Sequence, residues 1–394
     1  MKSIAIIFHD ADYFSGGTRS ILDIIDYWHE KRIFNIIAIF PKKKGSAIEY
    51  LKQKNIITIS EIYGTNSVPM KRNLYSFIRY FYKIILWFIT NFYTKNKLKR
   101  KLNKYDIDLI YTNTSTPYIG ALLKREMKIP HIWHFREFGE ENNDFTRLWG
   151  NKYFYKILNN YTDQIIVISK ILEKKIRKYT KLPIKVIYDD ISSKYINPNK
   201  IKAFESKPIN VLMVGALSEG KGQIQAIKAI EKLIIEKYSI CLYIAGKGSE
   251  EKKLKKYVKR NNLGKNIYFL GLIKNINKLR SKMDIGVVCS KAEAFGRVTI
   301  EGMLSKMVMI GANTGSTPEL IKDGITGFIY KWGIVDDLAN KVRILYKDPK
   351  IMKNVSEIAF NEAKAFTVGN AAIKCQEIIY EVFTKFKNKK NLIL

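Results

Sequence analysis

Short apolar runs alternate with amphipathic stretches along most of the chain. In the first half, seven runs predict buried strands at 3–8, 36–40, 56–59, 109–112, 131–135, 164–168 and 185–188. The segments between them include stretches with helical spacing at 19–31, 47–54, 119–127 and 170–179. Alternating strands and helices predict a parallel sheet that is covered by helices on both faces.

The pattern lapses into polar residues at 189–207 and then restarts, which predicts a second domain of the same kind. We expect an N-terminal domain at 1–190, a linker at 191–208, a C-terminal domain at 209–366, and a C-terminal helix at 367–394 that could pack back on the first domain. The fold class is therefore α/β, with two doubly wound Rossmann-like domains facing a cleft. In such sheets, ligands bind at the carboxyl ends of the strands.

The chain is strongly basic, and this adds an expectation about its ligands. It contains 69 Lys and Arg and 36 Asp and Glu, which gives a net charge of +33. Such a field attracts nucleic acids, anionic lipids and phosphorylated small molecules. Lys and Ile dominate the composition, so a compositional bias is an alternative source of the excess. Three scattered Cys and four His argue against a disulfide scaffold and a structural zinc site.

The segment from Lys71 to Lys104 is both basic and aromatic. It holds ten Lys and Arg and no Asp or Glu, and apolar residues recur at 77, 81, 84, 88 and 92, with Trp87 nearby. Its uncharged stretch at 84–94 is too short to span a bilayer. We expect an interfacial helix on an anionic membrane surface. The alternative is a helix packed on its own domain and followed by a solvated basic helix.

Two acidic residues, Glu293 and Glu301, flank a turn that contains Phe295, Gly296 and Arg297. The first acid follows a predicted strand at 285–289, and the second lies about one turn inside the following predicted helix. Free backbone N–H groups at the start of a helix can bind an anion. The pattern can thus offer two carboxylates to hydroxyl groups and a backbone turn to a phosphate.

This stretch resembles the Glu-x7-Glu motif of the retaining glycosyltransferases of family 4, which have the GT-B fold. The resemblance extends to Gly-x-x-Pro-Glu-Leu-Ile at 315–321 and Asp-Gly-x-Thr-Gly-Phe at 323–328. It implies that Glu301 binds the ribose of a nucleotide-sugar and that Glu293, a catalytic-site residue, binds the donor sugar. Phe295 and Gly296 would contribute to the same donor site.

The resemblance also assigns the groups that bind the donor diphosphate. The Gly-x5-Lys-Gly sequence that starts at Gly215 implies that Lys221 contacts the diphosphate, although the family's usual Arg after this glycine is Ala216 here. Arg297 could supply the missing charge, since a guanidinium grips phosphate bidentately. Lys221 and Arg297 are therefore expected to act in catalysis as well.

In the first half, the paired glycines Gly16 and Gly17 resemble the family's N-terminal loop, where backbone N–H groups approach the donor phosphate and the acceptor. Asp10 and Asp12 superficially match the Asp-x-Asp metal motif of the other main glycosyltransferase fold, and we interpret this match as a coincidence. The family's Asn-Gly after the strand ending at 188 is replaced here by Asp189 and another Asp.

The predicted strand at 131–135 runs into a polar loop, and the family places a catalytic polar residue, often His, at this strand end. His134 fits that position within a His-x-Arg-Glu variant, while Arg136 occupies the alternative position and Glu137 follows it. We expect His134 to be catalytic, and Arg136 and Glu137 to lie near the acceptor. His131 is expected to be structural.

These resemblances imply a retaining, hexosyltransferase-type enzyme that takes a sugar from a UDP- or GDP-sugar, with no metal or other cofactor. We expect a lipid-linked saccharide acceptor in cell-surface polysaccharide synthesis, and a cytoplasmic, peripheral location at the inner face of the membrane. Nucleic acid is not an expected partner, because no nucleic-acid-binding motif is present. The alternatives are an anionic-surface or nucleic-acid binding protein with a degenerate GT-B site, and a GT-B nucleotide-sugar epimerase.

Overall fold

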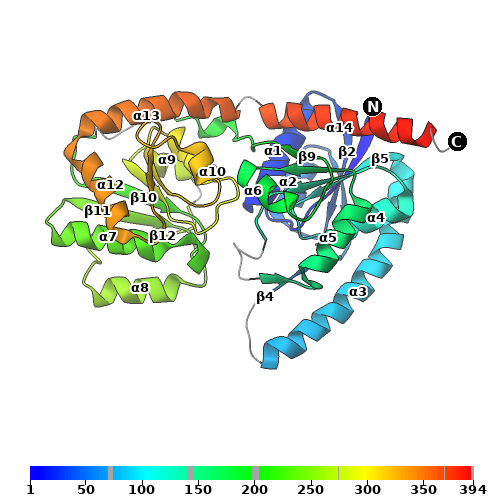
Figure 1. Ribbon diagram of the computed structural model, residues 1–394, viewed down its shortest axis with the longest axis horizontal. Coiled ribbons are helices and arrows are strands. Elements are labelled where there is room, and N and C mark those ends of the chain that lie inside the picture. The colour runs from blue at the N-terminus through cyan, green and yellow to red at the C-terminus, as the bar shows by residue number, and fades with distance from the viewer. Residues whose placement is uncertain (70–73, 140–144, 198–203, 274, 368, 392–394) are drawn as a thin grey trace. The chain divides into compact units, whose positions relative to one another are not determined.

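The computed structural model of the chain describes residues 1–69, 74–139, 145–197, 204–273, 275–367 and 369–391 (Figure 1). The chain divides into two compact units. Unit 1 comprises Met1–Asp190 together with Gly369–Leu394, and unit 2 comprises Ile191–Val368. Each unit is built around its own parallel sheet, and each is described by itself below.

Unit 1 contains a seven-stranded sheet in which every neighbouring pair is parallel. Its apolar strands are buried on both faces, as expected for a parallel sheet. In spatial order the strands are β3 (Ile57–Ser60), β2 (Phe34–Phe40), β1 (Lys2–Ile7), β5 (Ile107–Asn113), β6 (His131–Phe135), β8 (Gln164–Val167) and β9 (Ile184–Val186). A short antiparallel pair, β4 (Ser67–Pro69) and β7 (Phe145–Arg147), lies outside this sheet.

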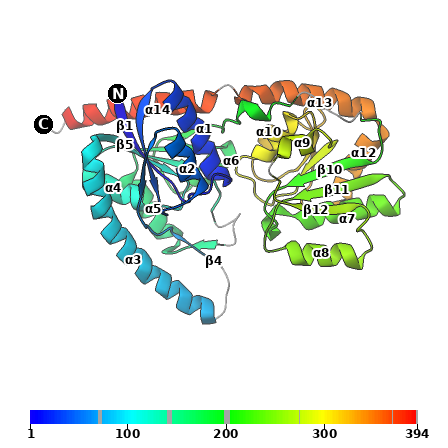
Figure 2. The ribbon, with the colours of Figure 1, turned by 180° about the vertical axis from the view of Figure 1, so that it is seen from behind.

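Helices cover both faces of the unit 1 sheet. One apolar core joins it to α1 (Gly16–Glu30), α2 (Ser46–Gln53) and α14 (Asn370–Asn391), and the other joins it to α3 (Leu74–Leu102) and α4 (Ile119–Met127). The remaining helices of this unit are α5 (Gly150–Tyr161), α6 (Lys170–Arg177) and the 3-10 turn η1 (Asn103–Tyr105). The indole N–H of Trp28 in α1 donates to the carbonyl of Ala372 at 3.0 Å, which ties α14 to α1 (Figure 2).

Unit 2 contains a six-stranded parallel sheet. In spatial order its strands are β12 (Ile267–Gly271), β11 (Ile240–Ala245), β10 (Ile209–Val214), β13 (Ile285–Val288), β14 (Val308–Ala312) and β15 (Phe328–Tyr330). Its helices are α7 (Gln223–Ile235), α8 (Glu251–Arg260), α9 (Ile276–Arg280), α10 (Arg297–Met303), α11 (Thr317–Leu320), α12 (Val335–Lys347) and α13 (Pro349–Ala363). Short 3-10 turns are η2 (Ser193–Tyr195), η3 (Glu219–Lys221) and η4 (Lys364–Thr367).

The predicted fold class, two doubly wound α/β domains, is confirmed. The strand order of unit 2 is the 3-2-1-4-5-6 order of a Rossmann fold, and unit 1 has the same reversal between β1 and β5. The basic segment predicted as helical forms one continuous helix, α3, although residues 71–73 lie outside the described residues. Part of the predicted linker, 198–203, also lies outside them.

Candidate active site

The strand order of unit 2 reverses between β10 and β13, and parallel α/β sheets bind ligands at the carboxyl ends of the strands at such a point. Gly215 follows β10 with a positive φ of 154°, a conformation that residues with side chains rarely adopt, and its carbonyl oxygen faces Gly246 of the next loop. A Cβ on Gly246 would lie 1.9 Å from the Gly215 carbonyl oxygen, so the two loops can stack only because residue 246 has no side chain. The Lys221 side chain lies beside Gly215 in these stacked loops.

Lys221 and Glu293 form an ion pair at this edge of the sheet. The Lys221 Nζ atom donates to the Glu293 Oε2 atom at 2.7 Å, and the Ser290 hydroxyl donates to the same oxygen at 2.8 Å. Burial alone would raise the pKa of Glu293, but the ammonium group of Lys221 and the two hydrogen bonds outweigh it, and the pKa is lowered. The Lys221 side chain is 36% exposed. The structure thus joins the two residues predicted to hold donor diphosphate and donor sugar.

Glu301 lies in α10 and is held by two arginines. Its Oε2 atom accepts a hydrogen bond from Arg280, which is buried at the end of α9, and its Oε1 atom lies 3.9 Å from the Arg297 Nε atom. The guanidinium of Arg280 also lies 5.7 Å from the ring centroid of Tyr195. Arg297 therefore lies within ion-pair distance of Glu301, whereas the sequence predicted that it supplies a positive charge to the donor diphosphate.

The turn between the two glutamates is shaped by its backbone. Gly296 adopts a positive φ of 96° immediately before α10, a conformation that L-residues rarely adopt. The side chain of Phe295 is buried and contacts Phe366, with ring centroids 5.9 Å apart. The Ser316 hydroxyl donates to the carbonyl oxygens of Glu293 (2.9 Å) and Phe295 (2.7 Å). The 315–321 motif thus fixes the backbone of the Glu-x7-Glu turn.

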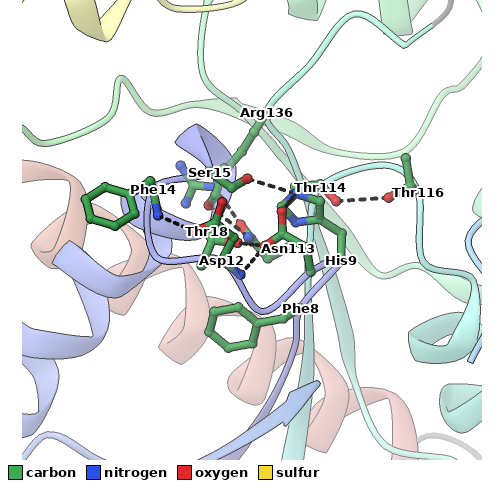
Figure 3. A network of polar contacts seen from close by, with 12 residues as sticks. Phe8, His9, Asp12, Phe14, Ser15, Thr18, Asn113, Thr114, Thr116 and Arg136 are labelled. Atoms are coloured by element: carbon green, nitrogen blue, oxygen red, sulfur yellow. Dashed lines mark hydrogen bonds and ion pairs between the residues drawn. The ribbon is translucent and has the colours of Figure 1, made fainter. Parts of the chain in front are cut away.

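In unit 1, polar side chains gather at the carboxyl ends of β1 and β5, around the predicted Gly-Gly loop (Figure 3). The His9 Nε2 atom lies 3.1 Å from Asp10 Oδ2 and 3.3 Å from the Ser15 hydroxyl, and the Thr18 hydroxyl donates to Asp10 Oδ1. Partial burial favours protonated Asp10, yet these partners stabilise the carboxylate more and lower its pKa to about 2. The cluster is polar, charged and about one-quarter exposed at His9 and Asp10.

Gly16 and Gly17 begin α1 beside this cluster. A Cβ on Gly17 would lie 3.0 Å from a methyl group of Thr114 and 3.3 Å from the His9 ring, so this glycine allows a close approach of α1 to both residues. A Cβ on Gly16 would meet nothing within 4 Å. The carbonyl of Gly17 accepts from Asn113 at 3.0 Å, which locks the loop to the end of β5.

Arg136 is buried in unit 1 and is fully engaged. Its guanidinium pairs with Asp189, donates through Nε to Asn113 Oδ1 at 2.6 Å, and donates through Nη2 to His134 Nδ1 at 3.1 Å. Asp189 also accepts from the hydroxyl of Ser20 at 2.6 Å. This network connects the ends of β5 and β6 with α1 and with the residues after β9.

His134 is fully buried within the same network. The Tyr111 hydroxyl lies 2.5 Å from its Nδ1 atom, which also accepts from Arg136, so Nε2 carries the ring proton. Burial and the nearby guanidinium of Arg136 hold the pKa of His134 well below its usual value, and the ring is neutral. Nε2 has no hydrogen-bond partner among the residues that the structure describes. A direct contact with a sugar would require the side chains that cover the ring to move.

Two further predicted residues have local roles. Glu137 caps the loop after β5, because its Oε1 atom accepts from the backbone N–H (2.6 Å) and the hydroxyl (2.7 Å) of Ser115. His131 is buried, with one ring nitrogen 2.6 Å from the Tyr161 carbonyl and the other 2.7 Å from the Thr112 hydroxyl. Burial lowers the pKa of His131 to about 4, so it is a neutral core residue.

Sequence reasoning missed two residues of these clusters. Arg280 is one of 69 Lys and Arg in the sequence, and only its pairing with Glu301 in the folded chain identifies its role. His9 directly follows the first strand, and its place at the carboxyl end of β1 was the signal that could have identified it. The Asp10 and Asp12 carboxylates engage loop partners, with Asp12 accepting from the Phe14 N–H at 3.0 Å.

Two family models match the chain. The Glycosyltransferase Family 4 model matches residues 9–189, and the Glycosyl transferases group 1 model matches residues 197–362. The two matches fall in unit 1 and unit 2, respectively. The chain is thus matched over both sheets and over both polar clusters.

Similar proteins agree with this assignment. An uncharacterized glycosyltransferase of Methanocaldococcus jannaschii is 27% identical over 290 residues, covering 72% of this chain and 78% of that one. The GalNAc-α-(1→4)-GalNAc-α-(1→3)-diNAcBac-PP-undecaprenol α-1,4-N-acetyl-D-galactosaminyltransferase of Campylobacter jejuni is 28% identical over 184 residues, covering 46% of this chain and 50% of that one. The structure of HepE of Anabaena in complex with UDP-glucose superposes with a TM-score of 0.78 at 19% identity, covering 97% of this chain and 100% of that chain.

Membership of one glycosyltransferase family therefore explains the Glu-x7-Glu turn, the lysine paired with it and the two doubly wound units. The predicted family resemblance is confirmed, and the structural similarity to HepE identifies the fold as GT-B. The protein belongs to glycosyltransferase family 4, the GT-B glycosyltransferases that use nucleotide-sugars.

Proposed function

We propose that the protein transfers a hexose from a UDP-sugar to a hydroxyl group of a lipid-linked saccharide, with retention of configuration at the anomeric carbon. The observation that carries this proposal is the pairing of both motif glutamates with cations at the carboxyl edge of the unit 2 sheet, Glu293 with Lys221 and Glu301 with Arg280. Retention follows the family, and the choice of UDP is supported by the UDP-glucose complex of HepE.

In this proposal Lys221 exchanges its partner when the donor binds. Its ammonium group leaves Glu293 for the diphosphate, and the Glu293 carboxylate then accepts hydrogen bonds from hydroxyls of the donor sugar. Glu301, oriented by Arg280, accepts from the ribose hydroxyls. Lys221, Arg297 and the backbone N–H groups of the 295–297 turn stabilise the negative charge that grows on the departing diphosphate. Electrostatic stabilisation of this kind commonly contributes more to catalysis than any other single effect.

Transfer breaks the bond between the anomeric carbon and the diphosphate oxygen and forms a bond from that carbon to the acceptor oxygen. The acceptor's proton passes to the departing diphosphate on the same face of the sugar. We assign His134 a role beside the transferred sugar, donating through Nε2. This assignment is supported by the occupation of Nδ1 by Arg136 and Tyr111, which leaves Nε2 as the donor. Gly16 and Gly17 are proposed to approach the donor phosphate and the acceptor.

The lipid-linked acceptor is supported by the Campylobacter jejuni relative, whose name specifies a saccharide on diphospho-undecaprenol. The net charge of +33 suits an acceptor that carries a diphosphate and lies at an anionic surface. We therefore propose that the enzyme works in the cytoplasm, peripherally at the inner face of the membrane, in the synthesis of a cell-surface polysaccharide.

The test is calorimetric binding of UDP, GDP, ADP and CMP to the full chain and to Glu301→Gln. Gln keeps a hydrogen-bond acceptor for the buried guanidinium of Arg280 while removing the negative charge. A matched control is Glu362→Gln, which alters an exposed ion pair with Lys322. We expect UDP alone to bind and Glu301→Gln to weaken it about tenfold or more, the loss of about 1.4 kcal/mol.

Binding of GDP in place of UDP would refute the UDP assignment and leave the transferase proposal intact. If no nucleotide binds, while salt-dependent nucleic-acid binding survives in Glu301→Gln, the site is degenerate and the alternative anion-binding function is favoured. Product analysis with UDP-glucose and a diphospho-lipid-linked saccharide then tests transfer. An α-linked product from the α-linked donor is expected.

A further inference from the structure

Helix α3 of unit 1 carries apolar side chains on its outer face. Nine large apolar residues between positions 78 and 93 are 44–71% exposed, and they span about 160° of the helix surface at 3.6 residues per turn. They are Ile78, Phe81, Tyr82, Ile85, Leu86, Phe88, Ile89, Phe92 and Tyr93. Contiguous apolar surface of this kind marks an interaction site on a folded protein. We call these nine residues the α3 face.

The opposite side of α3 is fixed to unit 1, so the α3 face is its outward side. Trp87 is buried and stacks edge-to-face with Tyr118, with ring centroids 5.5 Å apart. The Thr94 hydroxyl donates to the Ile62 carbonyl at 2.6 Å, and Leu98 is fully buried in the core beneath. Both ribbon views show the N-terminal half of α3 extending away from the sheet of unit 1 (Figures 1 and 2). The helix is therefore held in place without its apolar face.

The charge on α3 specifies what can cover this face. The helix contains seven Lys and Arg and no Asp or Glu, and five of the seven lie at 95–101. Lys97 and Lys101 pair with Glu61, yet their side chains remain 49% and 44% exposed, and Arg100 is exposed as well. A second copy of this chain would bring a second cationic helix against the first. The charge complementarity therefore favours an anionic partner.

We propose that the α3 face docks the protein on an anionic lipid bilayer. The aromatic and aliphatic side chains enter the boundary between headgroups and acyl chains, while the basic end of the helix binds the anionic headgroups. Tyr and Phe side chains with flanking Lys and Arg are typical of this interface. No helix among the described residues has the length and apolarity needed to cross a membrane. The docking concerns unit 1 alone. It names the surface for the peripheral membrane location in the proposed function, and it does not depend on the transfer reaction.

The test is sedimentation of the full chain with vesicles of phosphatidylcholine alone and of phosphatidylcholine with about 30 mol% phosphatidylglycerol. We expect binding to the anionic vesicles at least tenfold tighter than to the neutral ones. Phe88→Gln/Phe92→Gln should weaken the anionic binding about tenfold or more. The matched control, Ile235→Gln/Ile344→Gln, removes two exposed apolar residues from helices of unit 2 and should bind like the wild type.

A charge pair of variants separates specific docking from the general positive field. Arg100→Gln/Lys104→Gln should weaken binding about tenfold, while Lys252→Gln/Lys256→Gln on α8, with the same net charge, should weaken it less than threefold. Unfolding midpoints of all variants should match, because the substituted side chains are exposed. The proposal is wrong if anionic and neutral vesicles bind equally. It is also wrong if the wild type ignores vesicles but dimerises, and Phe88→Gln/Phe92→Gln restores the monomer.

Discussion

Both sheets carry an ion pair near the carboxyl ends of their strands, but the two pairs differ in exposure. In unit 2 the side chains of Lys221 and Glu293 are 36% and 18% exposed, whereas in unit 1 those of Arg136 and Asp189 are 1% and 4% exposed. A partly exposed pair can exchange one partner for a ligand at little cost. A buried pair cannot, because the abandoned charge would stay unpaired in a poorly solvated site.

The comparison teaches that an ion pair at the carboxyl ends of a parallel sheet can be accessible to a ligand in one unit and buried as an internal support in the other. Arg280 and Glu301 show that unit 2 also contains a buried pair, but this pair ends in a carboxylate near the site. There the buried arginine orients Glu301, which we propose binds the donor. In unit 1 the buried arginine instead joins Asn113, Asp189 and His134, so it fixes the loops around the polar cluster.

Breaking the buried pair of unit 1 should have the largest effect on stability. Arg136→Met leaves Asp189 buried without its cation, and the free energy of unfolding should fall by about 3–5 kcal/mol. Urea unfolding measures this change. The double variant Arg136→Met/Asp189→Leu should recover most of the loss, because no charge is then left unpaired.

A control for this prediction is the exposed pair of Arg177 and Glu173, whose atoms are 2.7 Å apart. Arg177→Met should cost less than about 1 kcal/mol. If Arg136→Met instead preserves stability but abolishes transfer, Arg136 is an acceptor-site residue and the contrast between the two units fails.

Breaking the partly exposed pair of unit 2 should affect activity more than stability. Lys221→Ala removes a cation from the departing diphosphate, and we expect kcat to fall by about 10²–10³. The free energy of unfolding should change by less than about 1 kcal/mol, since the pair is partly exposed. Lys228→Ala, on the exposed face of α7, is the matched control and should keep full activity. Retention of wild-type kcat in Lys221→Ala would contradict the proposed site.

A second carboxylate of unit 1, Asp190, links the end of the first segment of this unit to helix α14. It accepts hydrogen bonds from the N–H groups of Ala371 (2.9 Å) and Ala372 (3.3 Å) at the start of α14. Burial is the main reason that the pKa of Asp190 is raised to about 6, and these hydrogen bonds oppose it only partly. Because the unfolded chain releases this proton at lower pH, Asp190 lowers stability as the pH rises from about 4 to about 6.

Asp190→Asn should remove that decline while keeping an acceptor for α14. Urea unfolding at several pH values between 4 and 7 measures the slope for the wild type and the variant. An unchanged slope in Asp190→Asn would show that another group titrates in this range.

Much of this architecture could be predicted from sequence, because apolar runs and helical spacing are local signals. Helix α4 has the predicted bounds, and the Glu-x7-Glu turn lies between β13 and α10 as expected. The pairing of β4 with β7 was not predicted, since each strand has three residues and the partners lie far apart in sequence. The sequence also could not decide whether His134 or Arg136 is the polar residue that the family places at the end of this strand. Strand β6 is buried on both faces, so alternation along it carries no information on exposure.

The smallest expected effect concerns Asp10, and it has the opposite sign to that of Asp190. Although burial opposes its ionisation, the partners His9, Ser15 and Thr18 lower its pKa to about 2. Its contribution to stability is therefore present above the unfolded pKa near 4 and is lost as the pH falls towards 2. In Asp10→Asn, the free energy of unfolding should fall less steeply between pH 4 and pH 2 than in the wild type. Near pH 7 its dependence on pH should be almost unchanged. A wild-type decline at acid pH in Asp10→Asn would mean that the carboxylate gains nothing from its partners. The polar cluster of unit 1 would then be free to bind a ligand through Asp10, as we propose that unit 2 does through Lys221.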